Sequence, residues 1–372
     1  MKLLTTSVLL TLGIMLTIIT LATNLFLALS LPKASSPGWV KLRNASAHSM
    51  PEAAVAFHDS DPEILHVVTS RFMQLQPDLL ALGKARLHLF ETFCLPSMLQ
   101  QETDNFVWFV MTEPNLEKTL LERMRSLLAP HSNFYLVLMN DKLVTPEILT
   151  KSIEDQLILT GDVDRLRSIM FDNNRPLLLE TRLDADDALS RKTLRIIQQA
   201  ARSLPYDNGG WQVICNNLHY EWRNKEITAS TETVQTSGQL RLVMESMCIT
   251  AGYTLVCHRR QGSIDFPPWP RIGHHMISRE WPKCFGRRNV TKDCWIRLPK
   301  YPAALRSRTA TSAGMSRVEA TAKDSPYDNQ TDALWPYVEL DFGILPEEAK
   351  ATSSYLKSHL QEIVADNIKG QW

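Results

Sequence analysis

The chain has 372 residues, of which 44% are hydrophobic and 22% charged, a composition typical of a globular protein with a sizeable core. Its 40 Lys and Arg residues balance its 40 Asp and Glu residues. A chain without net charge has no overall field that attracts a polyanion, so we expect no nucleic-acid partner. A charged ligand has to be held locally.

Residues 3–31 contain no charged side chain, and this stretch exceeds the roughly 20 residues that a helix needs to cross a bilayer. We therefore predict a transmembrane signal anchor within residues 1–31. A cleavable signal peptide is the alternative, although its apolar centre is normally only about 7–15 residues long. Residues 32–60 mix Pro, Ser and Ala, as expected of a stem between the membrane and a folded domain.

Three glycosylation sequons, at Asn44, Asn289 and Asn329, follow the apolar segment. Together with the lack of a later apolar span, they predict a single-pass type II Golgi membrane protein whose large domain, 61–372, is luminal. The charges that flank the span favour the opposite orientation, so a cytosolic domain is the alternative. The six cysteines show no zinc-binding spacing and are compatible with disulfides, for example between Cys284 and Cys294, in an oxidising compartment.

Short apolar runs alternate with amphipathic segments from residue 61 onward, which predicts an α/β fold with a mostly parallel central sheet. Strands are expected at 64–69, 106–111, 134–139 and 176–179. Helices are expected at 79–93, at 116–128 with Asn115 as its cap, at 189–203 and at 346–368. The segment 301–333 lacks apolar periodicity and is predicted to be a mobile loop.

An acidic cluster, Asp184, Asp186 and Asp187, follows the apolar run at 176–179. Ligands of open α/β sheets bind at the carboxyl ends of the strands. Three carboxylates within four residues repel one another, so we expect a compensating divalent cation, Mn²⁺ or Mg²⁺. In an extended segment Asp184 and Asp186 would project to one side and Asp187 to the other, and such a pair suits a metal that bridges to a diphosphate.

Simpler interpretations of the cluster are also open. The three acids could cap a helix that begins at Ala188 and Leu189. A calcium-binding helix–loop–helix is disfavoured because Leu189 occupies the position where that loop needs Gly. A second Asp-x-Asp, at Asp162 and Asp164, is better explained as the start of a helix that Asp162 caps.

The chain resembles the rhamnosyltransferase-like family of nucleotide-sugar glycosyltransferases with the A-type fold. The similar stretches are VVTSRF at 67–72, RLHLFETFCLPSMLQQETDNFVWFVMTEP at 86–114 and RLDADDAL at 182–189, with weaker similarity through GYTLV at 252–256. The resemblance implies one Rossmann-like domain in a luminal type II enzyme. It also implies a metal, held by Asp184 and Asp186, and a nucleoside-diphosphate sugar donor.

Further candidate residues surround this expected site. Arg71 follows the first strand and Arg182 precedes the acids, so both are candidates for contact with the donor, as is Asp187. In many A-type glycosyltransferases a late histidine completes the metal shell, which makes His275, or its neighbour His274, the candidate here. An inverting reaction needs a carboxylate base, and the candidates for it are Asp265, Glu280 and Glu245.

We therefore predict a metal-dependent glycosyltransferase that transfers a hexosyl or deoxyhexosyl group, rhamnose included, from a nucleoside-diphosphate sugar. The acceptor would be a glycan, glycoprotein or glycolipid. The nucleotide-sugar-binding part would cover about 61–205 and the acceptor part about 206–372. The alternatives are a non-catalytic luminal sugar- or nucleotide-binding protein and a metal-dependent phosphohydrolase.

Overall fold

The computed structural model divides the chain into two units, residues 1–58 and 59–372. It describes parts of the second: residues 64–139, 152–170, 177–204, 211–224, 239–244, 251–258, 295–298, 301–312 and 331–370. The predicted membrane anchor and stem lie outside these residues. Among the described helices, none has the length and apolar character that crossing a bilayer requires.

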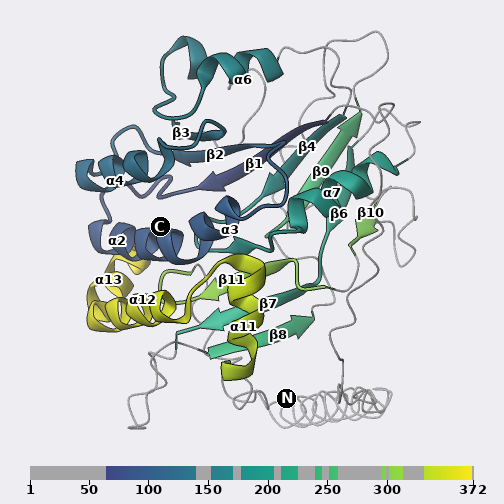
Figure 1. Ribbon diagram of the computed structural model, residues 1–372. Helices are drawn as coiled ribbons and strands as arrows, with labels where there is room; N and C mark the ends of the chain where they lie inside the picture. The colour runs from purple at the N-terminus through teal and green to yellow at the C-terminus, as the bar shows by residue number, and fades with distance from the viewer. Residues whose placement is uncertain are drawn as a thin grey trace, which may run out of the picture. The chain divides into compact units, whose positions relative to one another are not determined.

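The larger of two sheets has seven strands in the order β10-β6-β9-β4-β1-β2-β3 (Figure 1). These strands are β1 (Ile64–Arg71), β2 (Val107–Thr112), β3 (Phe134–Leu138), β4 (Leu177–Arg182), β6 (Trp211–Cys215), β9 (Tyr253–His258) and β10 (Trp295–Arg297). Every neighbouring pair is parallel except the two that β9 makes with β4 and β6. The mostly parallel central sheet and its four predicted strands are confirmed.

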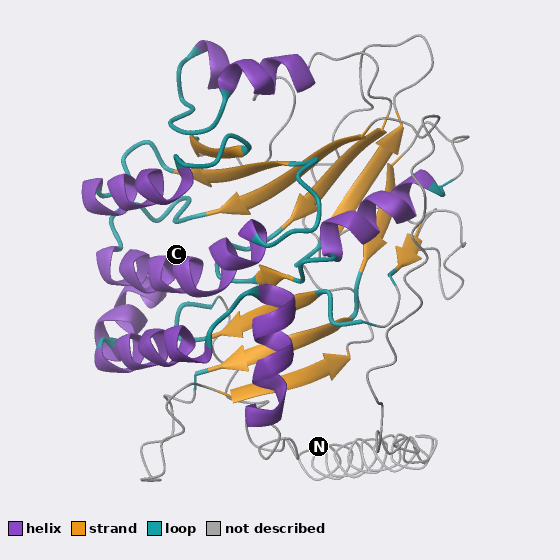
Figure 2. Ribbon diagram, viewed as in Figure 1, coloured by secondary structure: helices purple, strands orange, loops and turns teal. Residues whose placement is uncertain are grey.

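Helices cover both faces of this sheet (Figure 2). On one face Val68 of β1 packs with α2 (Leu80–Leu89), α4 (Lys118–Leu128) and α12 (Pro346–Ser358). The same face carries α7 (Thr193–Arg202), whose Ile197 packs on Ile64 and Leu179. On the opposite face Leu65 and Val67 pack with Leu166 of α6 (Val163–Met170).

Several helix boundaries differ from the prediction. The helix expected at 79–93 continues through a π-helical turn at Phe90–Cys94 into α3 (Leu95–Leu99). The helix expected at 346–368 is two helices, α12 and α13 (Leu360–Lys369), because His359 leaves the helical region at φ −113° and ψ 16°. The cap of α4 is Glu117, whose carboxylate accepts the Leu120 N–H at 3.1 Å, rather than Asn115.

A second sheet of four strands, in the order β5-β11-β7-β8, was not predicted. It consists of β5 (Ala188–Leu189), β7 (Leu218–Arg223), β8 (Gln239–Met244) and β11 (Ala304–Arg308). Leu189 pairs with Ala304, so α7 begins at residue 193 and not at 189. The strand β11 lies within the segment predicted to be a mobile loop, and α11 (Thr331–Phe342) begins at its end. The loop prediction is therefore wrong for 304–308 and 331–333, while 313–330 lie outside the described residues.

Candidate active site

The strand order places the acidic cluster at a switch point of the large sheet. The chain leaves β1 for β2 on one side and later returns as β4 on the other side of β1. Since β1 and β4 are parallel, their carboxyl ends share one edge, and the connections diverge there. Open α/β sheets bind ligands in the crevice at such a point. Arg71 ends β1 and Asp184 follows β4, so both lie at this edge.

The residues after β4 form a turn. Leu183 still follows the ladder, because its N–H bonds the Thr69 carbonyl at 3.0 Å, and the Asp187 N–H then bonds the Asp184 carbonyl at 3.0 Å. The extended conformation predicted for Asp184–Asp187 is therefore wrong, and with it the expected alternation of the acids. No helix begins at Ala188 either, since Ala188 and Leu189 form β5. In this turn the three aspartates line the same cleft.

The cleft has a volume of about 360 Å³. Residues from both sheets and from α2 line it. They are Arg71, Arg86, Asp184, Ala185, Asp186, Asp187, Arg306, Ser307, Arg308, Thr311 and Ser312. Four arginines thus face three aspartates around one hollow, an arrangement suited to a ligand that carries both metal-binding and anionic groups.

Each aspartate has a different exposure in the cleft. Asp184 is exposed and Asp186 half-buried, and neither carboxylate has a hydrogen-bond or ion-pair partner on another described residue. Asp187 is only 4% exposed, and its Oδ1 accepts the Ser307 N–H at 3.0 Å. Asp187 therefore fastens the acidic turn to β11, while Asp184 and Asp186 are left for a ligand.

The protein around the cleft shifts the titration of these acids. Although Asp184 reaches the surface, the protein around both carboxylates displaces water, and this desolvation raises the pKa of Asp184 and Asp186. The charge of Asp184 raises the pKa of Asp186 further. Burial raises the pKa of Asp187 well above its ordinary value, with the charge of Asp186 adding to the effect. The guanidinium groups of Arg86 and Arg306 oppose these shifts. Desolvation is thus the main cost of ionising these acids, and like charge adds to it at Asp186 and Asp187. A bound cation would offset both.

Neighbouring residues hold the Arg86 side chain in place and shift the pKa of both Arg86 and Arg71. The Arg86 guanidinium donates to Gln76 Oε1 at 2.6 Å and to the Thr311 carbonyl at 3.4 Å. Burial lowers its pKa, as it does that of Arg71, while Asp184 raises both. Arg86, Arg306 and Arg308 were missed by sequence reasoning. The only signal was the Arg-Ser-Arg at 306–308, which lies more than a hundred residues after the acids.

The backbone after β1 is sharply turned. Met73 and Leu75 both have positive φ, of 54° and 62°, a conformation that side chains other than Gly rarely adopt. The Glu113 carboxylate accepts the Leu75 N–H at 2.6 Å, and the Gln74 amide donates to the Met139 carbonyl at 3.0 Å. The ends of β2 and β3 therefore hold the loop that follows Arg71 at the switch point.

Arg182 does not line the cleft. Its side chain is 13% exposed and its Nε lies 3.6 Å from Oε1 of buried Glu180. It lies close enough to Arg71 to lower the pKa of Arg71. On the other side of Arg182, its carbonyl accepts the N–H of Gly252 at 2.9 Å, at a φ of +78° that favours glycine. The prediction that Arg182 contacts the donor stays a prediction, and Arg182 stands behind the site as the partner of Glu180.

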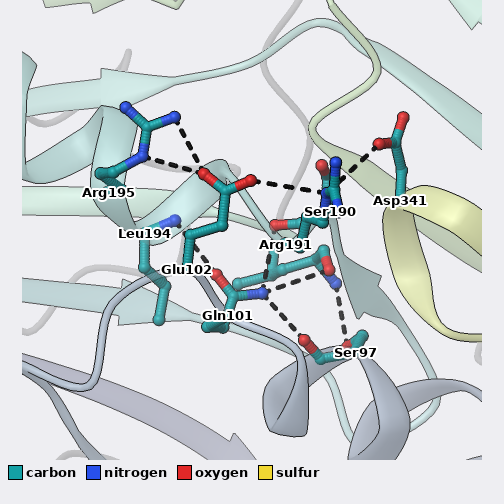
Figure 3. A network of polar contacts seen from close by, with 9 residues as sticks. Ser97, Gln101, Glu102, Ser190, Arg191, Leu194, Arg195 and Asp341 are labelled. Atoms are coloured by element: carbon teal, nitrogen blue, oxygen red, sulfur yellow. Dashed lines mark hydrogen bonds and ion pairs between the residues drawn. The ribbon is translucent and has the colours of Figure 1, made fainter. Parts of the chain in front are cut away.

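A polar network fastens the chain just beyond the acidic turn (Figure 3). The Gln101 amide donates to the carbonyls of Leu189 and Ser190 at 3.3 and 3.1 Å. Glu102 pairs with Arg191 at 3.4 Å and with Arg195 at 2.9 Å. Because β5 is only two residues long, these bonds from the segment after α3 define where the acidic turn ends.

Asp184 and Asp186 are the described residues that could hold the expected metal. Among the described residues, no group of three or more His, Cys, Asp and Glu side chains is arranged to hold an ion. Asp184 and Asp186 therefore fit a cation that takes few protein ligands and keeps positions for water and phosphate, as Mg²⁺ and Mn²⁺ do. His274, His275, Glu245, Asp265 and Glu280 lie outside the described residues.

Comparison with known proteins supports the enzyme class. Residues 71–237 match the family model described as "Putative rhamnosyl transferase". This match supports a glycosyltransferase. The matched segment begins at Arg71 and includes the acidic turn, so the predicted resemblance is confirmed on the residues that carry the cleft's acids. It ends before β11, which supplies the opposite wall.

Solved structures give weaker similarities. One is the "putative nucleotide-diphospho-sugar transferase" from Desulfovibrio desulfuricans G20, with 9% identity and a TM-score of 0.33 over 81% of this chain and 96% of that one. Another is the apo structure of the bifunctional glycosyltransferase WbbM, with 9% identity and a TM-score of 0.20 over 43% of this chain and 24% of that one. TM-scores this low do not establish a shared fold. No curated protein sequence matches the chain significantly.

Proposed function

We propose that this glycosyltransferase is metal-dependent and moves a sugar from a nucleoside-diphosphate sugar to a glycan, glycoprotein or glycolipid acceptor. The observation that carries the proposal is the cleft at the switch point of the large sheet. There Asp184 and Asp186 face four arginines across a hollow of about 360 Å³. Carboxylates select a hard divalent cation, and guanidinium groups select phosphate.

The chain's own residues would divide the work in the following way. Asp184 and Asp186 would hold Mn²⁺ or Mg²⁺, which would neutralise the charge that develops on the departing nucleoside diphosphate. Arg71 would orient the donor from the end of β1. Asp187, already bonded to the Ser307 N–H, keeps the two cleft walls together. The proton of the acceptor hydroxyl would pass to a carboxylate, for which Asp265, Glu280 and Glu245 remain the candidates.

We also propose that the enzyme acts in the Golgi lumen, anchored by residues 1–31. One structural feature supports an oxidising compartment, because Cys215 is disulfide-bonded. Structural disulfides persist in the secretory pathway and are rare in the cytosol. The three sequons support the same location.

The test is hydrolysis and transfer by the full-length chain in detergent, with a panel of nucleotide sugars and with Mn²⁺ or EDTA. We expect sugar release from at least one donor with Mn²⁺ and little with EDTA. Asp186→Asn, which keeps the size of the side chain, should lower kcat/KM about 100-fold or more.

The matched control is Asp164→Asn, in the second Asp-x-Asp of the chain, which should leave kcat/KM within about twofold. Equal loss in both variants would contradict the assignment. Release of phosphate from simple esters without a sugar donor would instead favour a phosphohydrolase. Absence of both binding and turnover for every donor would leave a non-catalytic protein.

A further inference from the structure

One wall of the cleft lies outside the segment that the family model matches. We call it the β11 wall: Arg306, Ser307 and Arg308 of β11, with Thr311 and Ser312 of the turn that follows. It faces the acidic turn, to which the bond between Ser307 N–H and Asp187 joins it. The proposed metal would bind on the acidic side of the cleft, so the β11 wall needs a role of its own.

Two groups on this wall have unused hydrogen-bonding capacity. Arg308 is half-buried, and within the described part of the chain its guanidinium makes no hydrogen bond or ion pair. The Ser307 side chain is 3% exposed, and its hydroxyl has no partner. The hydroxyl is enclosed by the protein, so of these two groups only the Arg308 guanidinium is placed to meet a ligand in the cleft.

The surroundings of the wall are electrically positive. His219 on β7 lies beside β11, because its Cα is paired with that of Ala304. Burial lowers the pKa of His219 to about 3, and the charges of Arg306 and Arg308 are among those that add to this effect. An anion placed here would meet an environment that already disfavours additional cations.

The turn after β11 is held from outside the sheet. The Arg86 guanidinium donates to the Thr311 carbonyl, at 3.4 Å, and to Gln76, at 2.6 Å. The Asn367 amide of α13 donates to the Ala310 carbonyl at 2.8 Å. The wall is thus positioned before any ligand arrives, which lowers the entropy cost of binding.

We propose that the β11 wall binds the diphosphate of the donor directly, through the Arg308 guanidinium. The inference rests on the proposed function and adds to it a second contact with the diphosphate that does not pass through the metal. Guanidinium and phosphate oxygens form paired, charge-assisted hydrogen bonds. Part of the affinity for nucleoside diphosphates should therefore persist without a divalent ion.

The test is equilibrium binding of UDP, GDP, dTDP and inorganic pyrophosphate to the full-length chain by calorimetry, once with EDTA and once with Mn²⁺. We expect measurable binding of at least one nucleoside diphosphate in EDTA and tighter binding with Mn²⁺. Arg308→Gln should weaken binding about tenfold or more under both conditions. Arg308→Lys should give an intermediate loss.

Two controls separate this wall from the rest of the site. Arg125→Gln, at an exposed position on α4, should bind as the wild type does. Asp186→Asn should lose only the increment that Mn²⁺ adds. Thermal denaturation should show that each variant folds as the wild type does.

Unchanged affinity of Arg308→Gln in EDTA would overturn the inference, as would wild-type binding that requires Mn²⁺. In both cases the proposed function would stand, because the donor would still bind. If the wild type bound no nucleoside diphosphate under either condition, the proposed function and this inference would both fail.

Discussion

The chain contains Asp-x-Asp twice, and the two copies have different environments. Asp162 precedes α6, where its Oδ1 accepts the Arg165 N–H at 2.9 Å. Asp164 pairs with Arg167 at 3.0 Å, and its side chain is 92% exposed. This copy is a helix start, as predicted. Asp184 and Asp186 instead line a cleft and make no such pairs.

The comparison shows that the spacing of two acids carries little information without their place in the fold. The copy at Asp162 belongs to a helix on one face of the large sheet. The copy at Asp184 follows a strand at the switch point, where chain connections diverge and a ligand can enter. Capping satisfies the first pair locally, while burial and like charge leave the second in need of a cation.

The two copies should differ most in their contribution to metal affinity. Asp184→Asn removes one of two carboxylates that we expect to hold Mn²⁺, so the dissociation constant should rise at least about 100-fold, since even loss of a supporting residue typically costs 10- to 100-fold. Asp162→Asn should change it less than about twofold. Titration of free Mn²⁺ by electron paramagnetic resonance would measure both. Similar dissociation constants for the two variants would mean that the cleft is not a metal site.

A smaller effect should appear in stability, with opposite sign in the two copies. Asp162→Ala removes a helix cap and should lower the free energy of unfolding by about 1 kcal/mol. Asp186→Asn removes a charge that the folded cleft disfavours, so without metal it should raise the free energy of unfolding by about 1 kcal/mol. Substitutions at functional sites often stabilise a protein in this way. Denaturant titration in EDTA measures both. A loss of stability in Asp186→Asn would show that its carboxylate is structural.

The strands of the large sheet could be predicted because the sheet is buried on both faces. Parallel strands that are covered on both faces have nearly continuous apolar sequences. Strand β2, with the sequence VWFVMT, is buried throughout. The position of the acids after β4 follows from the same pattern. Sequence reasoning therefore located Arg71 and the acidic turn from the order of strands alone.

The second sheet could not be predicted in this way. Its strand β11 reads ALRSR, and three of these five residues are buried, so no clear period marks it. Its pairing with β7 and β5 joins residues 85 or more positions apart. Arg306 and Arg308 reach the cleft through that long-range pairing, which neither composition nor spacing encodes. The turn at Asp184–Asp187 was misjudged for a related reason, because the bond from Ser307 to Asp187 comes from β11.

The smallest expected effect concerns pH, and it separates charge repulsion from other causes of stabilisation in Asp186→Asn. Burial raises the pKa of Asp186 in the folded protein above its ordinary value. The unfolded chain then releases this proton at a lower pH than the folded chain does, so the carboxylate costs stability as pH rises through the folded pKa. The stabilisation by Asp186→Asn should therefore be full, in the absence of metal, at pH values above the folded pKa. It should shrink as pH falls through that pKa, because the wild-type side chain becomes neutral as well.

Unfolding curves of both proteins in EDTA, from pH 7 to pH 4, measure the difference. A difference that stayed constant with pH would assign the stabilisation to packing or hydrogen bonding of the amide rather than to relief of charge.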